Sequence, residues 1–313
     1  MVTATGPAPG SEMTAAIGDI EDRSTAGVLH VAAIFASHMV LQRNKPIAVF
    51  GALDADCAGL EVSAEIRDFD GSVIVQAHAY ASKEIKNGFS PWRVMLPAQP
   101  EGGPYTLRVT AGNDFIEYYD VLIGEVWLAG GQSNMELELR NSENAEEALE
   151  SCADPLLRFY NVPKTGVINR NAEHAASWQE SSPENSGVMS AVAYYFARKL
   201  RDELDSDLPI GIIDCYIGGT SISCWMSEDA LNSSESGRAY LARYEQAVAG
   251  FDVYLVHIGA RVGVGPERAR DDGALRMMAR FLGGELAGFD HVGHKAVVAC
   301  ELLQLALMQQ IGT

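Results

Sequence analysis

Residues 124–139, GEVWLAGGQSNMELEL, combine an apolar run, two glycines and a serine between two carboxamides. A serine hydroxyl in such a setting can act as a nucleophile if a base removes its proton and N–H donors stabilise the oxyanion that forms. Ser133 is this candidate, and its own N–H is one candidate donor. Taken alone, the motif favours a structural role, in which Ser133 or Asn134 caps a following helix. It is not the Gly-x-Ser-x-Gly elbow of α/β-hydrolases.

A second apolar run also ends in glycines. LPIGIIDCYIGG (208–219) and EVWLAGG (125–131) are both typical of strands buried on both faces of a parallel sheet. RFYNV (158–162) predicts a further strand, and AEEALES (145–151) predicts a helix. This alternation indicates an α/β layer, in which ligands bind beyond the carboxyl ends of the strands. We therefore expect both glycine pairs to lie at one sheet edge, with the N–H of Gly219 as a second oxyanion donor.

The segment GVMSAVAYYFARKLRDEL (187–204) predicts an amphipathic helix. Its expected apolar face has residues at helical spacing: Val188, Ala191, Val192, Tyr195, Phe196, Lys199 and Leu200.

The chain before this layer has the pattern of short β-strands. LEVSAEIR (60–67) alternates apolar and polar residues, which predicts one buried and one exposed face. Asp70-Gly71 then predicts a hairpin turn. We expect another turn at Gly102-Gly103-Pro104, between two further strands. Many short strands with turns between them are typical of a small β-sandwich.

The composition excludes some classes of partner. The 313 residues carry a net charge of −19, which argues against nucleic acid and anionic membranes as partners because both bind basic surfaces. No apolar run is long enough to span a bilayer, and the N-terminus lacks the pattern of a signal peptide. The five cysteines are widely spaced, with none at metal-ligand spacing. We expect free thiols, a cytoplasmic protein, no metal and no cofactor.

Four ordered segments resemble one enzyme family. GEVWLAGGQSNMELEL resembles the nucleophile block of the sialate O-acetylesterase-like branch of the SGNH (GDSL-type) hydrolases. IFASHMVLQRNKPIAVFG (34–51) resembles the start of the β-sandwich that precedes the hydrolase domain. SAVAYYFARKL (190–200) and PIGIIDCYIGGTSISCWMS (209–227) resemble its next helix and second glycine block. The resemblance implies an SGNH-type parallel sheet with flanking helices, preceded by a small β-sandwich domain.

The same resemblance implies site residues and a substrate. Ser133 would be the nucleophile, with the N–H groups of Ser133 and Gly219 forming the oxyanion hole. Gln132 and Asn134 would support the nucleophile loop, and Trp225 would lie near the pocket. The implied reaction removes acetyl groups from hydroxyls of sialic acid or another acetylated carbohydrate, through an acetyl-enzyme.

The base is the weakest part of the match. The family ends in an Asp-x-x-His-Pro block, whereas this chain has GFDHVGHKA (288–296), in which Asp290 and His294 are four apart and no proline follows. His294 is the candidate base and Asp290 the residue that orients it. The predicted organisation is a flexible tail (1–26), a β-sandwich domain (27–117), a hydrolase-like domain (118–250) and a divergent C-terminal segment (251–313) with one strand and helices.

Two other functions remain open. The chain could have lost its base and be a catalytically incomplete remnant or a glycan-binding protein. It could also be a thiol enzyme that uses Cys215 or Cys224, which would need a lowered thiol pKa. An intact Asp-x-x-His block would favour the esterase, and its absence favours the remnant.

Overall fold

The computed structural model describes residues 23–24, 27–86, 88–164, 175–204, 207–244 and 246. Within these ranges the larger sheet contains β1 (Arg23–Ser24), β3 (Val40–Gln42), β5 (Glu61–Arg67), β6 (Val73–Tyr80), β8 (Gly102–Ala111), β9 (Asp114–Gly131), β10 (Asp154–Asn161), β11 (Trp178–Ser181) and β12 (Ile210–Tyr216). The smaller sheet contains β2 (Leu29–Val31), β4 (Ile47–Asp54) and β7 (Phe89–Leu96). The helices are α1 (Ser133–Glu136), α2 (Ala145–Glu150), α4 (Ala191–Glu203) and α5 (Glu228–Asn232). Short 3-10 turns are η1 (Ala55–Cys57), η2 (Leu139–Asn141), η3 (Ser186–Val188) and η4 (Ile222–Trp225).

The hairpin predicted at Asp70-Gly71 is confirmed. β5 and β6 pair antiparallel, and the turn is closed by the N–H of Asp68 donating to the carbonyl of Ser72. Gly71 has a φ of +82°, a conformation that glycine adopts without a steric penalty. The alternation of β5 is also as predicted, because Val62, Ala64 and Ile66 are all buried.

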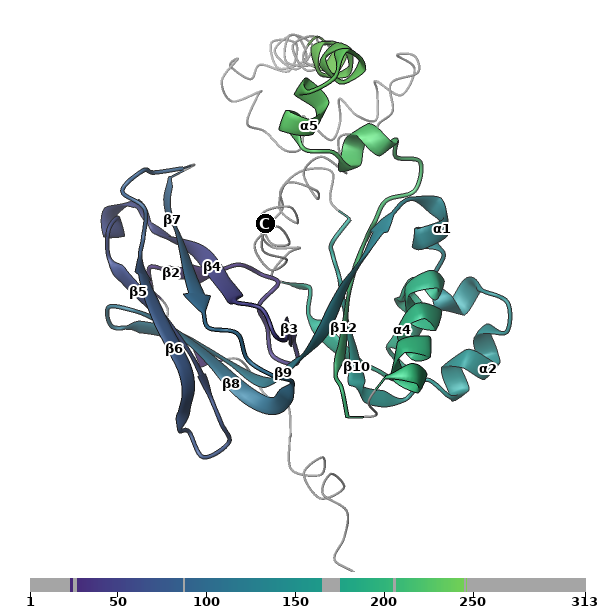
Figure 1. The fold of residues 1–313 in the computed structure, drawn as a ribbon, viewed down its shortest axis with the longest axis horizontal. Coiled ribbons are helices and arrows are strands. Elements are labelled where there is room, and N and C mark those ends of the chain that lie inside the picture. The colour runs from purple at the N-terminus through teal and green to yellow at the C-terminus, as the bar shows by residue number, and fades with distance from the viewer. Residues whose placement is uncertain are drawn as a thin grey trace, which may run out of the picture.

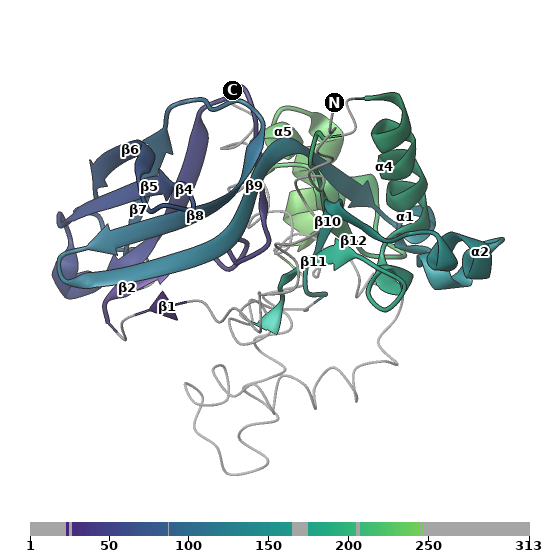
Figure 2. The same cartoon turned by 90° about the horizontal axis from the view of Figure 1, so that it is seen from below.

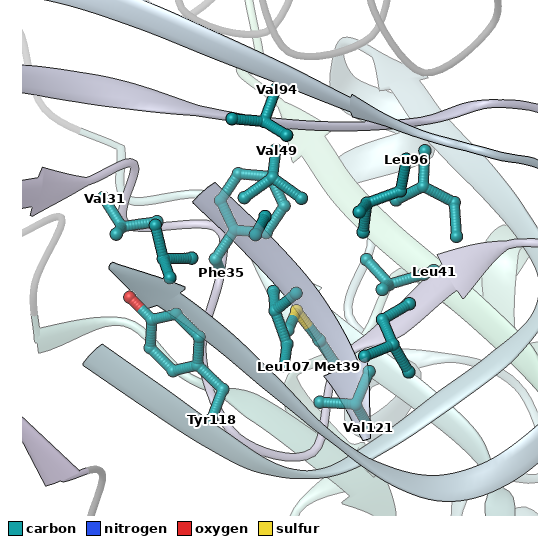
Figure 3. Close-up of a cluster of buried hydrophobic side chains, with 14 of the residues drawn as sticks. Val31, Phe35, Met39, Leu41, Val49, Val94, Leu96, Leu107, Tyr118 and Val121 are labelled. Carbon is teal, nitrogen blue, oxygen red and sulfur yellow. The ribbon is translucent and has the colours of Figure 1, made fainter. Parts of the chain in front are cut away.

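The two sheets of the N-terminal half share one hydrophobic core. The smaller sheet contributes side chains such as Val49 and Val94, and the larger sheet contributes Leu107 and Val121 from β8 and β9. Figure 3 shows these side chains pointing toward one another between the strands, with Met39 among them. Burial of apolar side chains between the two sheets is therefore the main force that holds this half together.

The turn predicted at residues 102–104 is wrong. These residues belong to β8, and Gly102 pairs with Ile123 of β9. The φ angles of +159° at Gly102 and +128° at Gly103 let the chain continue along β9 with an irregular register instead of reversing. A Cβ atom at Gly103 would clash with Leu122 and with the carbonyl of Val121, so only glycine lets β8 pack this closely against β9 at this position.

Strand β9 runs without a break through both halves of the molecule (Figure 1). Its first part pairs antiparallel with β8, and its last seven residues pair parallel with β12. The predicted burial of this last part on both faces is wrong, since Trp127 and Leu128 are 43% and 42% exposed. The ring of Trp127 contacts Phe196 of α4 at a centroid distance of 5.0 Å.

Strands β10, β12 and β9 form the parallel layer that the alternation predicted. β12 lies between β10 and β9, parallel to both, and each of its residues is buried. Helices α1, α2 and α4 lie together on one side of these strands (Figures 1 and 2). A second hydrophobic cluster, which includes Phe159, Tyr194 and Ile212, fills the space between them.

The predicted amphipathic helix is present as α4, but only part of its predicted apolar face is buried: Ala191 is buried, and Leu200 packs partly against the core. Ala193, Tyr194 and Ala197 are buried against the sheet, whereas Val192 and Tyr195 are exposed. Alanines lack bulk beyond Cβ, so this face lets the helix pack closely on β12. The buried hydroxyl of Tyr194 donates a hydrogen bond to the carbonyl of Ala148 at 3.3 Å, so it is not left without a partner. Spacing alone had favoured the row of larger side chains.

A buried arginine joins the two halves. Arg158 of β10 pairs with the carboxylate of Asp120 at 2.8 Å and donates to the carbonyls of Asp120 and His38 at 2.6 and 3.1 Å. The imidazole of His38 lies 2.7 Å from Asp120, and Glu180 of β11 pairs with the guanidinium at 3.3 Å. His38, Asp120 and Glu180 have a spacing that could hold a metal ion, but Arg158 already supplies the positive charge to these carboxylates.

None of the helices in the described ranges combines the length and the apolar character that crossing a bilayer requires.

Candidate active site

The two glycine blocks meet at one edge of the sheet, as predicted. Tyr216 at the end of β12 pairs with Gly131 at the end of β9, and the N–H of Ile217 donates to the carbonyl of Gly131 at 3.1 Å. The residues that follow each strand therefore face each other. The side-chain oxygen Oε1 of Gln132 accepts from the Ser133 hydroxyl at 2.6 Å and from the N–H of Gly219 at 3.3 Å. The hydroxyl and this N–H thus converge on a single acceptor oxygen.

The backbone at this edge depends on glycine. Gly219 has a φ of +78°, in the left-handed region that costs other residues about 1–2 kcal/mol. Ser133 is the first residue of α1, where the N-cap is Gln132 and no side chain makes a capping hydrogen bond. The alternative in which Ser133 or Asn134 caps a helix is therefore wrong. The Ser133 side chain is exposed and free of that structural task.

Ser133 opens onto a cavity of about 440 Å³. The cavity lies between α1, the residues after it and the second glycine block, and its lining residues are Ser133, Glu136, Leu137, Glu138, Asn141, Lys164, Gly218 and Gly219. This volume is within the about 300–1,000 Å³ of sites that hold small ligands. The nucleophile candidate and the oxyanion donor candidate thus share one ligand-sized cavity.

A carboxylate fixes the position of the second glycine block. Glu136 accepts a hydrogen bond from the N–H of Gly218 through one oxygen, and its other oxygen pairs with Lys164 at 2.7 Å. Burial opposes the charge of Glu136, but Lys164 and the N–H of Gly218 outweigh it, so its pKa lies below the usual carboxyl value. Glu136 is therefore an anchor for the loop, and such a weak base is poorly suited to take a proton from Ser133.

The other predicted pocket residues have different surroundings. Gln132 contacts both Ser133 and Gly219, as described above. Asn134 is exposed and is not among the residues that line the cavity. Trp225 packs against the large hydrophobic core, and its indole N–H donates to the hydroxyl of Thr220 at 2.8 Å. Trp225 therefore supports the loop after Gly219 from the side of the hydrophobic core, and it does not line the cavity.

No histidine of the described ranges lines this cavity. His30 pairs with Asp54 and His38 with Asp120, both in the N-terminal half, and His78 lies in β6. The predicted base His294 and its partner Asp290 lie outside the described residues. The thiols Cys57 and Cys152 are free. Neither they nor Cys215 lines the cavity.

Asp214 is a notable polar residue that the sequence interpretation missed. It lies in β12 and is 2% exposed, and one of its carboxylate oxygens accepts from the N–H of Ser190 at 3.0 Å. Its other oxygen, Oδ1, has no hydrogen-bond partner among the described residues. Burial raises the pKa of Asp214 to about 7, although Ser190 and Lys164 oppose this shift. An aspartate inside the apolar run IGIIDCY was the available signal.

This raised pKa predicts a pH-dependent stability. An unfolded aspartate has a pKa of about 3.9, so between about pH 4 and 7 the folded state holds a proton that the unfolded state releases. The stability contribution of Asp214 is therefore highest below pH 4 and falls until pH 7. Asp214→Asn removes this cost, and we expect it to be more stable than the wild type by about 2–4 kcal/mol at pH 8, with a small difference at pH 4. Urea unfolding at both pH values measures this; an equal gain at both would contradict it.

The family comparison agrees with this geometry. Residues 123–256 match the family model described as "Carbohydrate esterase, sialic acid-specific acetylesterase". The matched region starts in β9 and includes Ser133, the cavity and Gly219.

Individual relatives agree with the family model. The chain is 30% identical to rat sialate O-acetylesterase over 212 residues and 28% identical to the human protein over 229 residues. These alignments cover 63% and 68% of this chain, but only 37% and 41% of the relatives, so the chain spans about two-fifths of their length.

A solved structure is similar as well. A carbohydrate acetylesterase from Xanthomonas citri is 32% identical, with a TM-score of 0.54, over 67% of this chain and 44% of that one. Its similarity supports the α/β class of the fold. Residues 123–256 of this chain are therefore similar in sequence to the sialic acid-specific acetylesterase family of carbohydrate esterases.

Proposed function

We propose that the chain carries the nucleophile half of a serine carbohydrate O-acetylesterase. In this reaction the Ser133 Oγ forms a bond to the carbonyl carbon of an acetyl ester, and the bond between that carbon and the sugar oxygen breaks. The base takes the Ser133 proton and gives it to the departing sugar hydroxyl. Water then attacks the acetyl-enzyme, releasing acetate and restoring the Ser133 hydroxyl.

One observation carries this proposal. The Ser133 hydroxyl and the Gly219 N–H converge on a single acceptor, the amide oxygen of Gln132, at the wall of a ligand-sized cavity. An ester carbonyl oxygen is an acceptor of the same kind. We propose that it takes the place of the Gln132 oxygen, so that the N–H groups of Gly219 and Ser133 stabilise the oxyanion. Asn134 would hold the nucleophile loop, and Trp225 would support the glycine block from the core.

The proposed base is His294, oriented by Asp290, and both lie outside the described residues. The described residues that line the cavity include carboxylates and one lysine but no histidine, which supports a base from another part of the chain. The same observation favours a second candidate function, a glycan-binding protein without a base.

The proposed domain organisation places a β-sandwich domain at 27–117 and an SGNH-type hydrolase domain at 118–250. The core shared by the two sheets of the N-terminal half supports the first. The parallel order of β10, β12 and β9 supports the second.

Trapping the acetyl-enzyme tests the function. We expect the protein to release p-nitrophenol from p-nitrophenyl acetate, and mass spectrometry of acid-quenched protein to find one acetyl group on the peptide that contains Ser133. The same assay with O-acetylated sialic acid should release acetate. Binding of this sugar without acetate release would favour the glycan-binding function, and an acetyl group on a cysteine would favour the thiol enzyme.

Gly219→Ala tests the oxyanion donor. The substitution strains the backbone at a φ of +78° and displaces the N–H, so we expect kcat for p-nitrophenyl acetate to fall about 10- to 100-fold. Gly71→Ala is the matched control, because it imposes the same strain at a φ of +82° in the β5–β6 turn. Its kcat should equal that of the wild type. Equal losses in both variants would mean that only general strain matters.

A further inference from the structure

A second, smaller cavity adjoins the one at Ser133. It has a volume of about 240 Å³ and shares Glu138 and Lys164 with the first cavity. Sites that enclose drug-sized ligands have about 300–1,000 Å³, so this cavity is suited to a group of the size of one ring. Its position at the carboxyl ends of β10 and β12 is where ligands bind in parallel sheets.

Two side-chain oxygens that line this cavity are buried and have no donor within the described part of the chain. Oδ1 of Asp214 and Oδ1 of Asn161 are buried and have no hydrogen-bond partner among the described residues. Such oxygens are costly unless a donor reaches them. Asn161 of β10 and Asp214 of β12 lie opposite each other on adjacent parallel strands, so they are neighbours in the sheet.

The rest of the lining limits the ligand that could supply these donors. Val162, Pro163 and Val188 provide an apolar wall. The hydroxyl of Tyr216 donates to the carbonyl of Val188 at 3.4 Å. Lys164 is engaged by Glu136 at 2.7 Å and by the face of the Tyr216 ring at 4.6 Å. The two buried oxygens without a partner among the described residues are acceptors, which suit hydroxyl donors and disfavour a carboxylate.

We propose that Asp214 and Asn161 form a subsite that accepts hydrogen bonds from the hydroxyls of a neutral sugar ring. The apolar wall would contact the C–H face of that ring, while an acetyl ester reaches Ser133 through the adjoining cavity. This inference rests on the proposed function only for identifying the ligand as the sugar of an acetylated glycan. If water alone satisfies the two oxygens, neither sugar will bind the wild type.

Binding of two matched sugars tests the subsite without any turnover. Methyl β-galactoside and methyl β-galacturonate share a ring, but the second carries a carboxylate. Ligand-observed NMR titration of the wild type should give a Kd for the neutral sugar at least about tenfold lower than for the anionic one. Asp214→Asn replaces the free acceptor by an amide that can present a donor. At pH 8, above the pKa of about 7 to which burial raises Asp214, this acceptor is a carboxylate. At that pH we expect Asp214→Asn to weaken binding of the neutral sugar about 10- to 100-fold, the size of one hydrogen bond to a charged group.

Two further variants keep the result interpretable. Asn161→Ala should also weaken binding, and Glu203→Gln, at an exposed site on α4, should not. The subsite is refuted if neither sugar binds the wild type, if the anionic sugar binds as well as the neutral one, or if Asp214→Asn and Asn161→Ala bind like the wild type. Because these sugars carry no ester, the titration stands apart from esterase activity: binding with no hydrolysis of acetyl esters would contradict the proposed function and leave the subsite supported.

Discussion

Ser133→Ala is expected to lower kcat for p-nitrophenyl acetate at least about 1,000-fold. Without Oγ no acetyl-enzyme can form, and loss of the nucleophile in serine hydrolases removes most of the rate enhancement. The oxyanion donors and the cavity remain, so a small residual rate above the uncatalysed reaction is expected. A stopped assay over several hours can measure both rates.

The fold should survive this substitution. Ser133 is exposed, and its hydroxyl donates to the neighbouring Gln132, so the free energy of unfolding should change by less than about 0.5 kcal/mol. Ser151→Ala is the matched control, since it removes an exposed hydroxyl at the end of α2. It should keep wild-type activity. If Ser133→Ala and wild type hydrolyse the ester equally, Ser133 is not the nucleophile.

The sequence predicted the meeting of Ser133 and Gly219 because strand direction is encoded in local patterns. Two apolar runs that each end in glycine, with helices between them, imply parallel strands whose carboxyl ends share an edge. The pairing of Tyr216 with Gly131 confirms this. The hydrogen bonds of the Gln132 oxygen could not be predicted, because they depend on side-chain rotamers.

Burial was predicted less well where two faces compete. Helix α4 has a row that contains the large apolar residues Val192, Tyr195 and Phe196 and a second row with alanines and Tyr194, and hydrophobicity alone favoured the first. The structure buries the second, since small side chains permit close contact with the strands. Likewise, EVWLAGG is apolar enough for full burial, but exposure of Trp127 depends on what covers it.

Asp214 and Arg158 show why buried polar residues escape a sequence interpretation. Each lies within an apolar strand, and its partners are distant in the chain. Arg158 contacts His38 and Asp120, which are 120 and 38 residues away. A charged residue in an apolar run signals that such partners exist but does not identify them.

Arg158→Ala is expected to lower the free energy of unfolding by about 3–5 kcal/mol. The side chain is 4% exposed and joins β9, β10 and β11 to His38, which lies two residues before β3. Its loss leaves the largely buried carboxylate of Asp120, which is 12% exposed, without its guanidinium and removes the donor to two carbonyls, which is far costlier than losing an exposed pair. Urea unfolding at pH 7 measures the effect. Arg140→Ala, which breaks the exposed pair with Glu138, is the control and should cost less than about 1 kcal/mol.

The pH dependence identifies the origin of this loss. Burial opposes ionisation of Asp120, but His38 and Arg158 outweigh it, so the pKa of Asp120 lies below its usual value. The stability from this pairing is complete above the unfolded pKa of about 3.9 and is lost as the pH falls through the lower folded pKa. The gap between wild type and Arg158→Ala should therefore narrow below about pH 4.

A double variant separates charge from packing. If the loss comes mainly from the Asp120 carboxylate, which then keeps only His38 as a partner, adding Asp120→Asn to Arg158→Ala should recover about 1–2 kcal/mol, because an amide is less costly to bury than a charge. No recovery, together with a gap that stays constant with pH, would mean that Arg158 acts through packing and its carbonyl hydrogen bonds. A loss below about 1 kcal/mol in the single variant would show that the two halves are held together by the cores alone.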